Sequence, residues 1–264
     1  MAYLSDGSFQ FLGSIKGLTA YKRSGSEKIF LRAKGGPSKT QVKKSPAFAN
    51  PRRNMSEFGG RSTTAKWIMR TFPSLSHIAD HNILAALNSL LRPVQKLDTT
   101  SDWGKCNVLL SLNPQSLQGF NVNRKNTLDS IIRPDISYEL SKPTMSAIVR
   151  IPELLPGYSL KIPRNEPWYR ISAVLGVIPD VVYRDRKYIA MDATTETPFG
   201  HIDSNWFPVN EGSPACELKL TLLPANLSSY SLMLMVGISL GSVAGANYIQ
   251  PVKHWGAAKI IGVV

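Results

Sequence analysis

Ser239 lies in a stretch that matches a motif for nucleophilic catalysis. GISLG at 237–241 has the Gly-x-Ser-x-Gly spacing of the nucleophile elbow, in which a serine sits on a sharp turn between a strand and a helix. The residues after Ser239 lack a helical pattern, and Glu217 is the last acid of the chain, so His254 has no carboxylate between the serine and itself. We interpret Ser239 as a residue inside a strand.

Two histidines four residues apart have the spacing of a metal site. His77 and His81, in HIADH, would lie on the same side of a helix and could both face one metal ion. The stretch lacks the glutamate that follows the first histidine in zinc proteases, and His201 and His254 fall in unrelated segments. We interpret the pair as solvent-facing or hydrogen-bonded histidines and keep metal binding as the alternative.

Two further patterns fall short of a site. GGPSK at 35–39 places glycine before lysine as phosphate-binding loops do, but it lacks the full Gly-x4-Gly-Lys-Ser/Thr pattern. Asp180 and Asp185 flank a predicted strand, and nothing in the sequence brings them into one cleft, so we interpret both as solvated surface carboxylates. The sequence therefore identifies no catalytic residue, no cofactor and no small-molecule substrate.

Positive charge is concentrated near the start of the chain. Of the 31 Lys and Arg residues, 14 fall between Ser14 and Arg70, where only Glu27 and Glu57 are acidic. Such a field favours a negatively charged partner, although a solvated basic face that keeps the protein soluble is the alternative. The residues that we expect to contact acidic or phosphate groups are Lys34, Lys39, Lys43, Lys44, Arg52 and Arg53.

A hairpin should precede this basic arm and helices should follow it. LTAYKR and KIFLRA are rich in β-formers and flank the turn SGSE, which predicts a hairpin within 13–36. Glycines and prolines interrupt 34–53, so we expect an extended chain there. One helix should begin at an N-cap on Ser62 and end before Pro73.

An amphipathic helix should cover 74–93 and dock on a core. Its apolar face would hold Leu75, Ala79, Ile83, Leu87 and Leu90, with His77, His81 and Asn88 on the opposite side.

The pattern changes from about residue 105 onward. Short β-branched or aromatic segments are separated by Pro, Gly, Asn and Asp without a helical pattern between them, which favours an antiparallel sandwich or barrel. The segment 230–240 is apolar on both faces, so we expect it either at the centre of a closed core or against a neighbouring subunit. No repeat of fixed period is present, which argues against a solenoid or propeller.

Composition indicates a globular chain. Hydrophobic residues make up 43% of the sequence, enough for a core. The longest apolar run, at 232–238, is far shorter than the roughly 20 residues of a membrane-spanning helix, and the start lacks a secretory pattern, so we expect a cytoplasmic protein. Cys106 and Cys216 share no motif, which favours two packed thiols over a disulfide.

The N-terminal region resembles a family of bacterial proteins that are mostly uncharacterised. LGSIKGLTAYKRSGSEKIFLRAKGGPSK, followed by SPAFANPRRNMSEFGG, has the Gly-rich hairpin, the basic Gly-Gly-Pro arm and the Asn-x-x-Glu-Phe-Gly segment of that family. LQGFNVNRKNTL at 117–128 is similar as well. The resemblance implies that the arm is a native element of the fold, and it transfers no catalytic residue.

Together these patterns predict an α+β chain, mainly an antiparallel β-sandwich or barrel with a short helical segment and an extended N-terminal arm. We expect a hairpin and basic arm over 1–53, helices over 54–104 and an antiparallel β domain over 105–264. The predicted function is a non-enzymatic structural subunit that assembles with copies of itself into a filament, tube or shell; a nucleic-acid-binding or packaging protein is the alternative. The hairpin residues that would contact a neighbouring subunit are Leu18, Tyr21, Ile29, Phe30 and Leu31.

Overall fold

The computed structural model describes residues 2–4, 11–23, 26–192, 197–245 and 248–264. The chain forms two compact units, Met1–Arg52 and Arg53–Val264, which we call the N-terminal unit and the large unit. About 25% of the chain is helical and 37% is in strands, and the sheets are antiparallel, so the predicted α+β class is confirmed. The described strands form open sheets and no closed barrel.

The N-terminal unit contains a four-stranded antiparallel sheet in the order β1-β4-β3-β2. Its strands are β1 (Ala2–Leu4), β2 (Gly13–Ile15), β3 (Leu18–Lys22) and β4 (Ile29–Ala33). The predicted hairpin is confirmed: β3 pairs with β4, and Tyr21 lies opposite Phe30. Part of its predicted turn, at 24–25, lies outside the described residues. Among the described strands, β3 and β4 each pair on both sides, so β1 and β2 form the edges of the sheet.

The prediction of an extended arm over 34–53 is wrong. The segment forms helix α1 (Lys39–Lys44), the 3-10 turn η1 (Pro46–Phe48) and the start of helix α2 (Ala49–Arg70). Ser38 begins α1 with a capping box, in which its hydroxyl accepts from Gln41 N and the Gln41 side chain accepts from Ser38 N. Pro46 and Pro51 lie in the first turns of helical elements instead of breaking them, because a proline in a first turn loses no intrahelical hydrogen bond.

Helix α2 also begins earlier than predicted. Ser62 lies inside it, not at its N-cap, and Gly59 and Gly60 are interior positions. A Cβ on Gly60 would lie 2.6 Å from Cε1 of Tyr188, so the missing side chain lets that ring pack directly on the helix. The contact explains why a residue of poor helix propensity occupies this place.

The single helix predicted over 74–93 is instead two elements. The 3-10 helix η2 (Pro73–Ile78) is followed by α3 (Ile83–Lys96), which begins at Asn82, whose side chain accepts from Ala85 N. Residues 79–82 break the helix because Asp80 binds another segment through its carboxylate. Asn88, predicted to face away from the core, is buried and accepts from the Ser62 hydroxyl.

Irregular structure occupies 105–136, so the strands of the large unit begin later than predicted. Short helical turns lie in this stretch: η3 (Leu110–Leu112), η4 (Pro114–Leu117) and α4 (Leu128–Ile131). The strands are β5 (Ser137–Ser141), β6 (Ser146–Ile151), β7 (Trp168–Pro179), β8 (Val181–Arg184), β9 (Lys187–Ala190), β10 (Phe199–Asp203), β11 (Phe207–Pro208), β12 (Cys216–Thr221), β13 (Tyr230–Gly245), β14 (Tyr248–Pro251) and β15 (Ala257–Val263).

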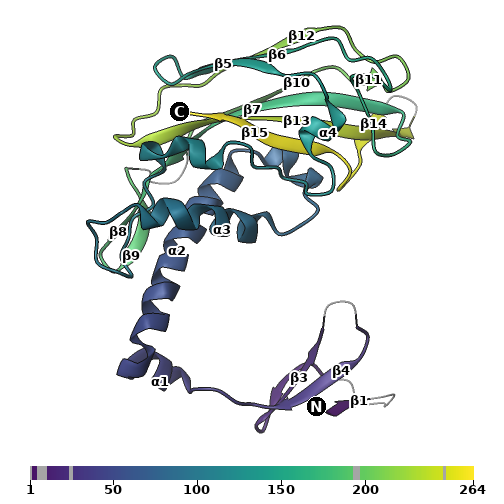
Figure 1. Cartoon of the computed structure of the whole chain (residues 1–264). Coiled ribbons are helices and arrows are strands. Elements are labelled where there is room, and N and C mark those ends of the chain that lie inside the picture. Colours follow the sequence, from purple (N-terminus) through teal and green to yellow (C-terminus); the bar gives the residue numbers. More distant parts are fainter. Residues whose placement is uncertain (1, 5–10, 24–25, 193–196, 246–247) are drawn as a thin grey trace. The chain divides into compact units, whose positions relative to one another are not determined.

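The large unit has three layers (Figure 1). A six-stranded sheet, built on β10-β7-β13-β14 with β11 and β15 attached, forms the middle. The sheet β12-β6-β5 covers one face, and helices α2 and α3 with η2 cover the other. A separate hairpin, β8–β9, extends beside the helices.

Strand β13 is apolar on both faces because it contributes to two hydrophobic cores. Met233 and Met235 pack in the core beneath the helices, whereas Leu234 and Val236 pack in the core between the two sheets. Alternate side chains of a strand point to opposite faces, so a strand buried on both sides must be apolar throughout. The central place predicted for 230–240 is confirmed, and burial against a neighbouring subunit is not needed to explain its composition. Among the described residues, no helix is long and apolar enough to cross a bilayer.

Candidate functional site

The predicted subunit-contact residues of the hairpin lie on two opposite faces of its sheet. Leu18 and Leu31 share one face with Ile15, because directly opposed residues of paired strands point the same way. Tyr21 and Phe30 occupy the other face, with their ring centroids 5.9 Å apart. Ile29 lies on the Leu18 face and is buried. These five residues therefore do not form one surface.

The predicted phosphate-contact residues divide into three groups. Lys34, Lys39, Lys43 and Lys44 are exposed in the N-terminal unit. Arg52 instead donates from Nη1 to the carbonyl oxygens of Val42 and Ser45, at 2.8 and 2.9 Å, and so caps the end of α1. Arg53 belongs to the large unit, where its guanidinium lies 5.0 Å from the ring centroid of Trp103.

Ser239 lies inside β13, which confirms its interpretation as a strand residue. Its hydroxyl is 3.2 Å from Nε2 of His77, so a serine–histidine pair exists that the sequence did not predict. Burial lowers the pKa of His77, nearby Arg170 adds to this effect, and a hydrogen bond with the Ser74 backbone opposes it. Ser239 is 1% exposed beneath the helical layer, however, and a nucleophile must reach its substrate.

The two histidines of HIADH do not share a helix face. His77 lies in η2, whereas His81 lies in the loop before α3, with Nδ1 2.7 Å from Oδ1 of Asp80. Their interpretation as hydrogen-bonded residues is confirmed by these contacts. Within the described ranges, no group of three or more His, Cys, Asp or Glu side chains is placed to hold a metal ion.

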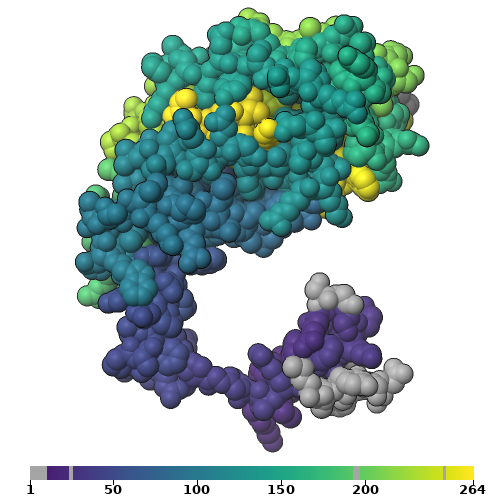
Figure 2. All heavy atoms as spheres, in the orientation of Figure 1, coloured from purple at the N-terminus to yellow at the C-terminus, as the bar shows by residue number. Residues whose placement is uncertain are grey.

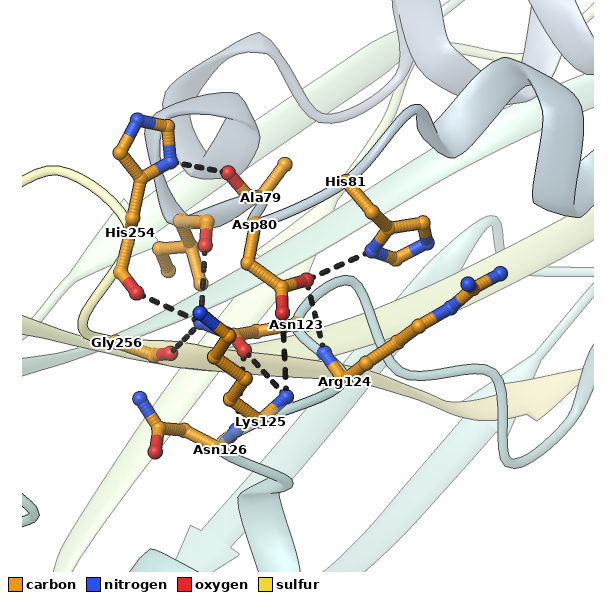
Figure 3. A network of polar contacts seen from close by, with 10 residues as sticks. Ala79, Asp80, His81, Asn123, Arg124, Lys125, Asn126, His254 and Gly256 are labelled. Atoms are coloured by element: carbon orange, nitrogen blue, oxygen red, sulfur yellow. Dashed lines mark hydrogen bonds and ion pairs between the residues drawn. The ribbon is translucent and has the colours of Figure 1, made fainter. Parts of the chain in front are cut away.

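A polar network around Asn123 joins three segments that are distant in sequence (Figure 3). Asn123 is buried, and its amide nitrogen donates to the carbonyl oxygens of Ile78, His254 and Gly256 at 3.0–3.2 Å. The Asp80 carboxylate accepts from the backbone N–H groups of Arg124 and Lys125. Hydrogen bonds to the carboxylate lower the pKa of Asp80 against the opposing effect of burial. The network serves the fold, since the buried Asn123 amide and the Asp80 carboxylate bond groups of the chain itself. Within the described residues, Nε2 of His81 is buried without a hydrogen-bond partner.

Asp180 is not the solvated carboxylate that the sequence suggested. It is 1% exposed and accepts from Ser111 N, Ser111 Oγ and Ser229 Oγ at 2.9, 2.5 and 2.6 Å. The carboxylate thereby fastens the loop at 111 to the end of β7. Asp185 is exposed in the β8–β9 turn, as predicted.

A pocket of about 660 Å³ opens between the N-terminal half of α2 and the C-terminal end of α3. We call it the α2–α3 pocket. It combines exposed apolar side chains with three cations and a single carboxylate. Its lining residues are Asn54, Met55, Glu57, Phe58, Arg61, Arg92, Lys96 and Trp103.

The loop that carries Trp103 is anchored on both sides of the ring. Glu57 accepts from Gly104 N at 2.9 Å, and the Gln95 side chain donates to Cys106 O at 2.8 Å. Asp98 accepts from the N–H groups of Thr100, Ser101 and Asn107, and these bonds hold the pKa of its carboxyl well below the usual range. Trp103 is nevertheless 48% exposed, so the fold holds a large aromatic ring in solvent.

The charges of the pocket are poorly balanced. Burial lowers the pKa of Arg61, and the neighbouring charge of Arg92 lowers it further, whereas Glu57 raises it. Arg61 donates from Nη1 to Oε1 of Gln95 at 2.5 Å, which is a neutral acceptor. Among the described residues, Arg92 and Lys96 form no ion pair. Arg61 is half-buried and Arg92 and Lys96 are exposed beside it, so like charges lie close together around the pocket, which favours an incoming anion.

A second pocket, of about 340 Å³, differs from the α2–α3 pocket in its balance of charge. It lies beside β15, whose atoms reach the surface in yellow in Figure 2. Its lysine, Lys259, is paired with Asp129 at 2.7 Å. The charge of this lysine is already balanced within the chain, so it gives no reason to expect an anionic ligand in this pocket.

Sequence reasoning missed the α2–α3 pocket entirely. Phe58 with Arg61, and Arg92 with Lys96, have the i,i+3 and i,i+4 spacing of side chains on one helix face, which was a usable signal. Their convergence with Trp103 depends on how two helices and a loop pack, which no local pattern records.

Comparisons with protein-family models, with curated proteins and with solved structures gave no match for this chain. The function proposed below therefore rests on the residues described above.

Proposed function

We propose that the chain is a non-enzymatic structural subunit that associates with copies of itself through its N-terminal unit. The observation that carries this proposal is the apolar face of the β3–β4 sheet. Ile15 and Leu18 on this face are 54% and 48% exposed, and only Ala20 and Ile29 are buried hydrophobic residues among the described part of the unit. A sheet with so small a core is marginally stable in water and gains stability when its apolar face is covered.

The edge strand β2 favours a second copy of the chain as the partner. Gly13, Ser14 and Ile15 form a short strand that carries neither charge nor proline, two of the features by which proteins keep edge strands from pairing with other chains. Identical edges can pair antiparallel about a two-fold axis, which joins two sheets into one longer sheet with their apolar faces side by side. A two-fold contact of this kind closes as a dimer, so growth into a filament, tube or shell would need a further, head-to-tail contact between subunits.

The proposal includes no catalysis, and the contacts of the two residues considered as candidates for catalysis support this. Ser239 and Asp180 are both buried and both engaged in contacts that join elements of the fold. A packing role accounts for each of them.

Nucleic-acid binding through the arm is the second candidate function. Lys34, Lys39, Lys43 and Lys44 are all exposed within eleven residues, and the N-terminal unit carries ten Lys and Arg against two Asp and Glu. Lysines spaced in this way neutralise phosphates, so binding would weaken steeply as salt rises from about 50 to 200 mM. Self-association by apolar contact and backbone pairing would persist over this range.

Light scattering on a size-exclusion column tests the proposal. We expect the full-length chain to elute as a multimer that contains protein only, as judged by the ratio of absorbance at 260 and 280 nm. Leu18→Glu should shift the mass to that of one subunit, because it places a charge on the apolar face. Thr19→Glu is the matched control, since the neighbouring residue points to the other face of the same strand.

Three outcomes would contradict self-assembly. The wild-type chain could elute as a monomer at high concentration, both variants could remain multimeric, or both could dissociate equally. A particle that contains nucleic acid and falls apart as salt rises would instead support the second candidate.

A further inference from the structure

We propose that the α2–α3 pocket binds a nucleotide, either free or as one unit of a single-stranded nucleic acid. This inference is independent of self-assembly, because every residue of the pocket belongs to the large unit. It also differs from phosphate contact by the arm, since it assigns a site for a base.

The aromatic side chains provide the place for a planar ring. Trp103 and Phe58 are 48% and 53% exposed, and Met55 lies beside them in the lining. The guanidinium of Arg53 covers one side of the Trp103 ring at 5.0 Å from its centroid. A base stacked on the other side would complete an arginine–tryptophan–base stack, an arrangement in which proteins hold unpaired bases without reading a duplex.

The cations provide the place for phosphate. Arg61, Arg92 and Lys96 line the pocket, and Arg92 and Lys96 come from successive turns of α3. Arginine and lysine side chains bind phosphate through charge-assisted hydrogen bonds. A phosphate would also relieve the repulsion between Arg61 and Arg92, which Glu57 offsets in part while it is engaged with Gly104 N.

The hydrogen bonds that hold the loop of Trp103 support a binding role for its ring. Glu57, Gln95 and Asp98 fix the loop around Trp103 through hydrogen bonds to its backbone. A loop whose backbone is held in this way loses little conformational entropy when a ligand binds. Asn54 adds an amide that can both donate to and accept from the edge of a base.

Size and charge select this class of ligand over other occupants. A volume of about 660 Å³ falls in the range of small-molecule sites, roughly 300–1,000 Å³. The N-terminal unit of a second copy carries ten cations against two acids and would be repelled by the three cations of the pocket. An anionic group with a flat ring satisfies both the charge and the exposed aromatic surface.

Titration of the full-length protein with four probes tests the proposal and separates its two sources. The probes are AMP, a ten-nucleotide single-stranded DNA labelled with fluorescein, inorganic triphosphate and a hexaglutamate peptide, with binding measured by calorimetry or anisotropy. A site for free nucleotides should bind AMP as tightly as the oligonucleotide. A site for single-stranded nucleic acid should bind the oligonucleotide at least tenfold more tightly than AMP.

Variants then locate the binding. Trp103→Ala should weaken binding of the preferred probe at least fivefold, the lower end of what one base–aromatic stack contributes, and Trp103→Phe should restore most of it. Arg92→Gln should weaken binding as well and reduce its dependence on salt. Lys253→Gln is the matched control, because Lys253 is an exposed cation outside the pocket.

Several results would overturn the proposal. One is binding of neither AMP nor the oligonucleotide, and another is equal affinity for hexaglutamate or triphosphate, which would mean that the pocket responds to charge alone. A third is oligonucleotide binding that survives Trp103→Ala and Arg92→Gln but is lost when Lys39, Lys43 and Lys44 are all changed to Gln. That result would assign the binding to the arm. Circular dichroism of each variant confirms that a loss of binding is not a loss of fold.

Discussion

Gly60 lies directly against the ring of Tyr188: a Cβ at this position would be 2.6 Å from Cε1 and 2.7 Å from Cδ1 of the tyrosine. The ring cannot move away freely, because the Tyr188 hydroxyl donates to Cys106 O at 3.1 Å. Gly59, the preceding residue of the same helix, has open space where its side chain would be. Two adjacent glycines of α2 therefore have opposite structural roles.

This difference predicts opposite effects of the same substitution. Gly60→Ala should lower the free energy of unfolding by about 1–3 kcal/mol, since it overpacks a contact that includes a fixed ring. Gly59→Ala should raise it by about 0.5–1 kcal/mol, because alanine has the higher helix propensity and its Cβ would meet open space there. Urea denaturation of both variants beside wild type measures the two shifts. Equal effects of the two changes would mean that Tyr188 does not pack on α2 as described.

Asp180 and Asp185 form a second matched pair, five residues apart. Asp180→Asn replaces a buried carboxylate that accepts three hydrogen bonds, and the amide would direct an N–H group toward donors at Ser111 and Ser229. We expect a loss of about 2–4 kcal/mol of unfolding free energy. Asp185→Asn should change stability by less than about 0.5 kcal/mol, because the residue is exposed with φ of 51° and asparagine adopts such turns readily. Chemical denaturation would show whether the two losses differ.

The strands were predictable from the sequence because their patterns are local. β7, β13 and β15 are long β-branched or apolar runs bounded by turn residues, and the β3–β4 hairpin has a glycine-containing turn between two β-forming segments. The extended arm was predicted wrongly because of its prolines. Proline breaks the interior of a helix but is compatible with its first turn, where Pro46 and Pro51 lie. Helix α1, which lies before them, is held by Ser38 at its start and by Arg52 at its end, and the Arg52 contact is not visible in a local sequence pattern.

The candidate site was less predictable because it depends on tertiary packing. Ser239 and His77 are 162 residues apart, and their contact requires η2 to lie on β13. Trp103 is not part of a periodic apolar pattern, so the sequence does not show whether its ring is buried. Its exposure depends on the hydrogen bonds that hold its loop. Burial of Asp180 was likewise missed, because its partners Ser111 and Ser229 come from two other segments.

His77 predicts a dependence of stability on pH. Burial lowers its pKa in the folded protein below the ordinary value of about 6.5, so the unfolded chain takes up a proton more readily. The unfolding free energy should therefore fall as pH decreases below about 6.5, and it should be constant with respect to this group at higher pH. His77→Gln should reduce the slope between pH 6.5 and 5, whereas His201→Gln, at an exposed position, should leave it unchanged. Melting temperatures across pH 5–7.5 provide the comparison, and an unaltered slope in His77→Gln would assign the dependence to other groups.

Asn123 should be among the most sensitive polar positions of the large unit. Its amide donates to three carbonyl groups, and its Oδ1 accepts from the N–H groups of Lys125 and Asn126 at 2.9 and 3.0 Å (Figure 3). Asn123→Asp replaces the donor with a second acceptor in a fully buried place, so three carbonyl oxygens would face a carboxylate. We expect this variant to lose at least about 3 kcal/mol of unfolding free energy and Asn123→Ala to lose about 2–4 kcal/mol. Asn226→Ala, an exposed control, should have the stability of wild type. Hydrogen exchange locates the effect: protection should fall first in η2, in 121–128 and around Gly256, because the Asn123 side chain bonds groups of all three segments.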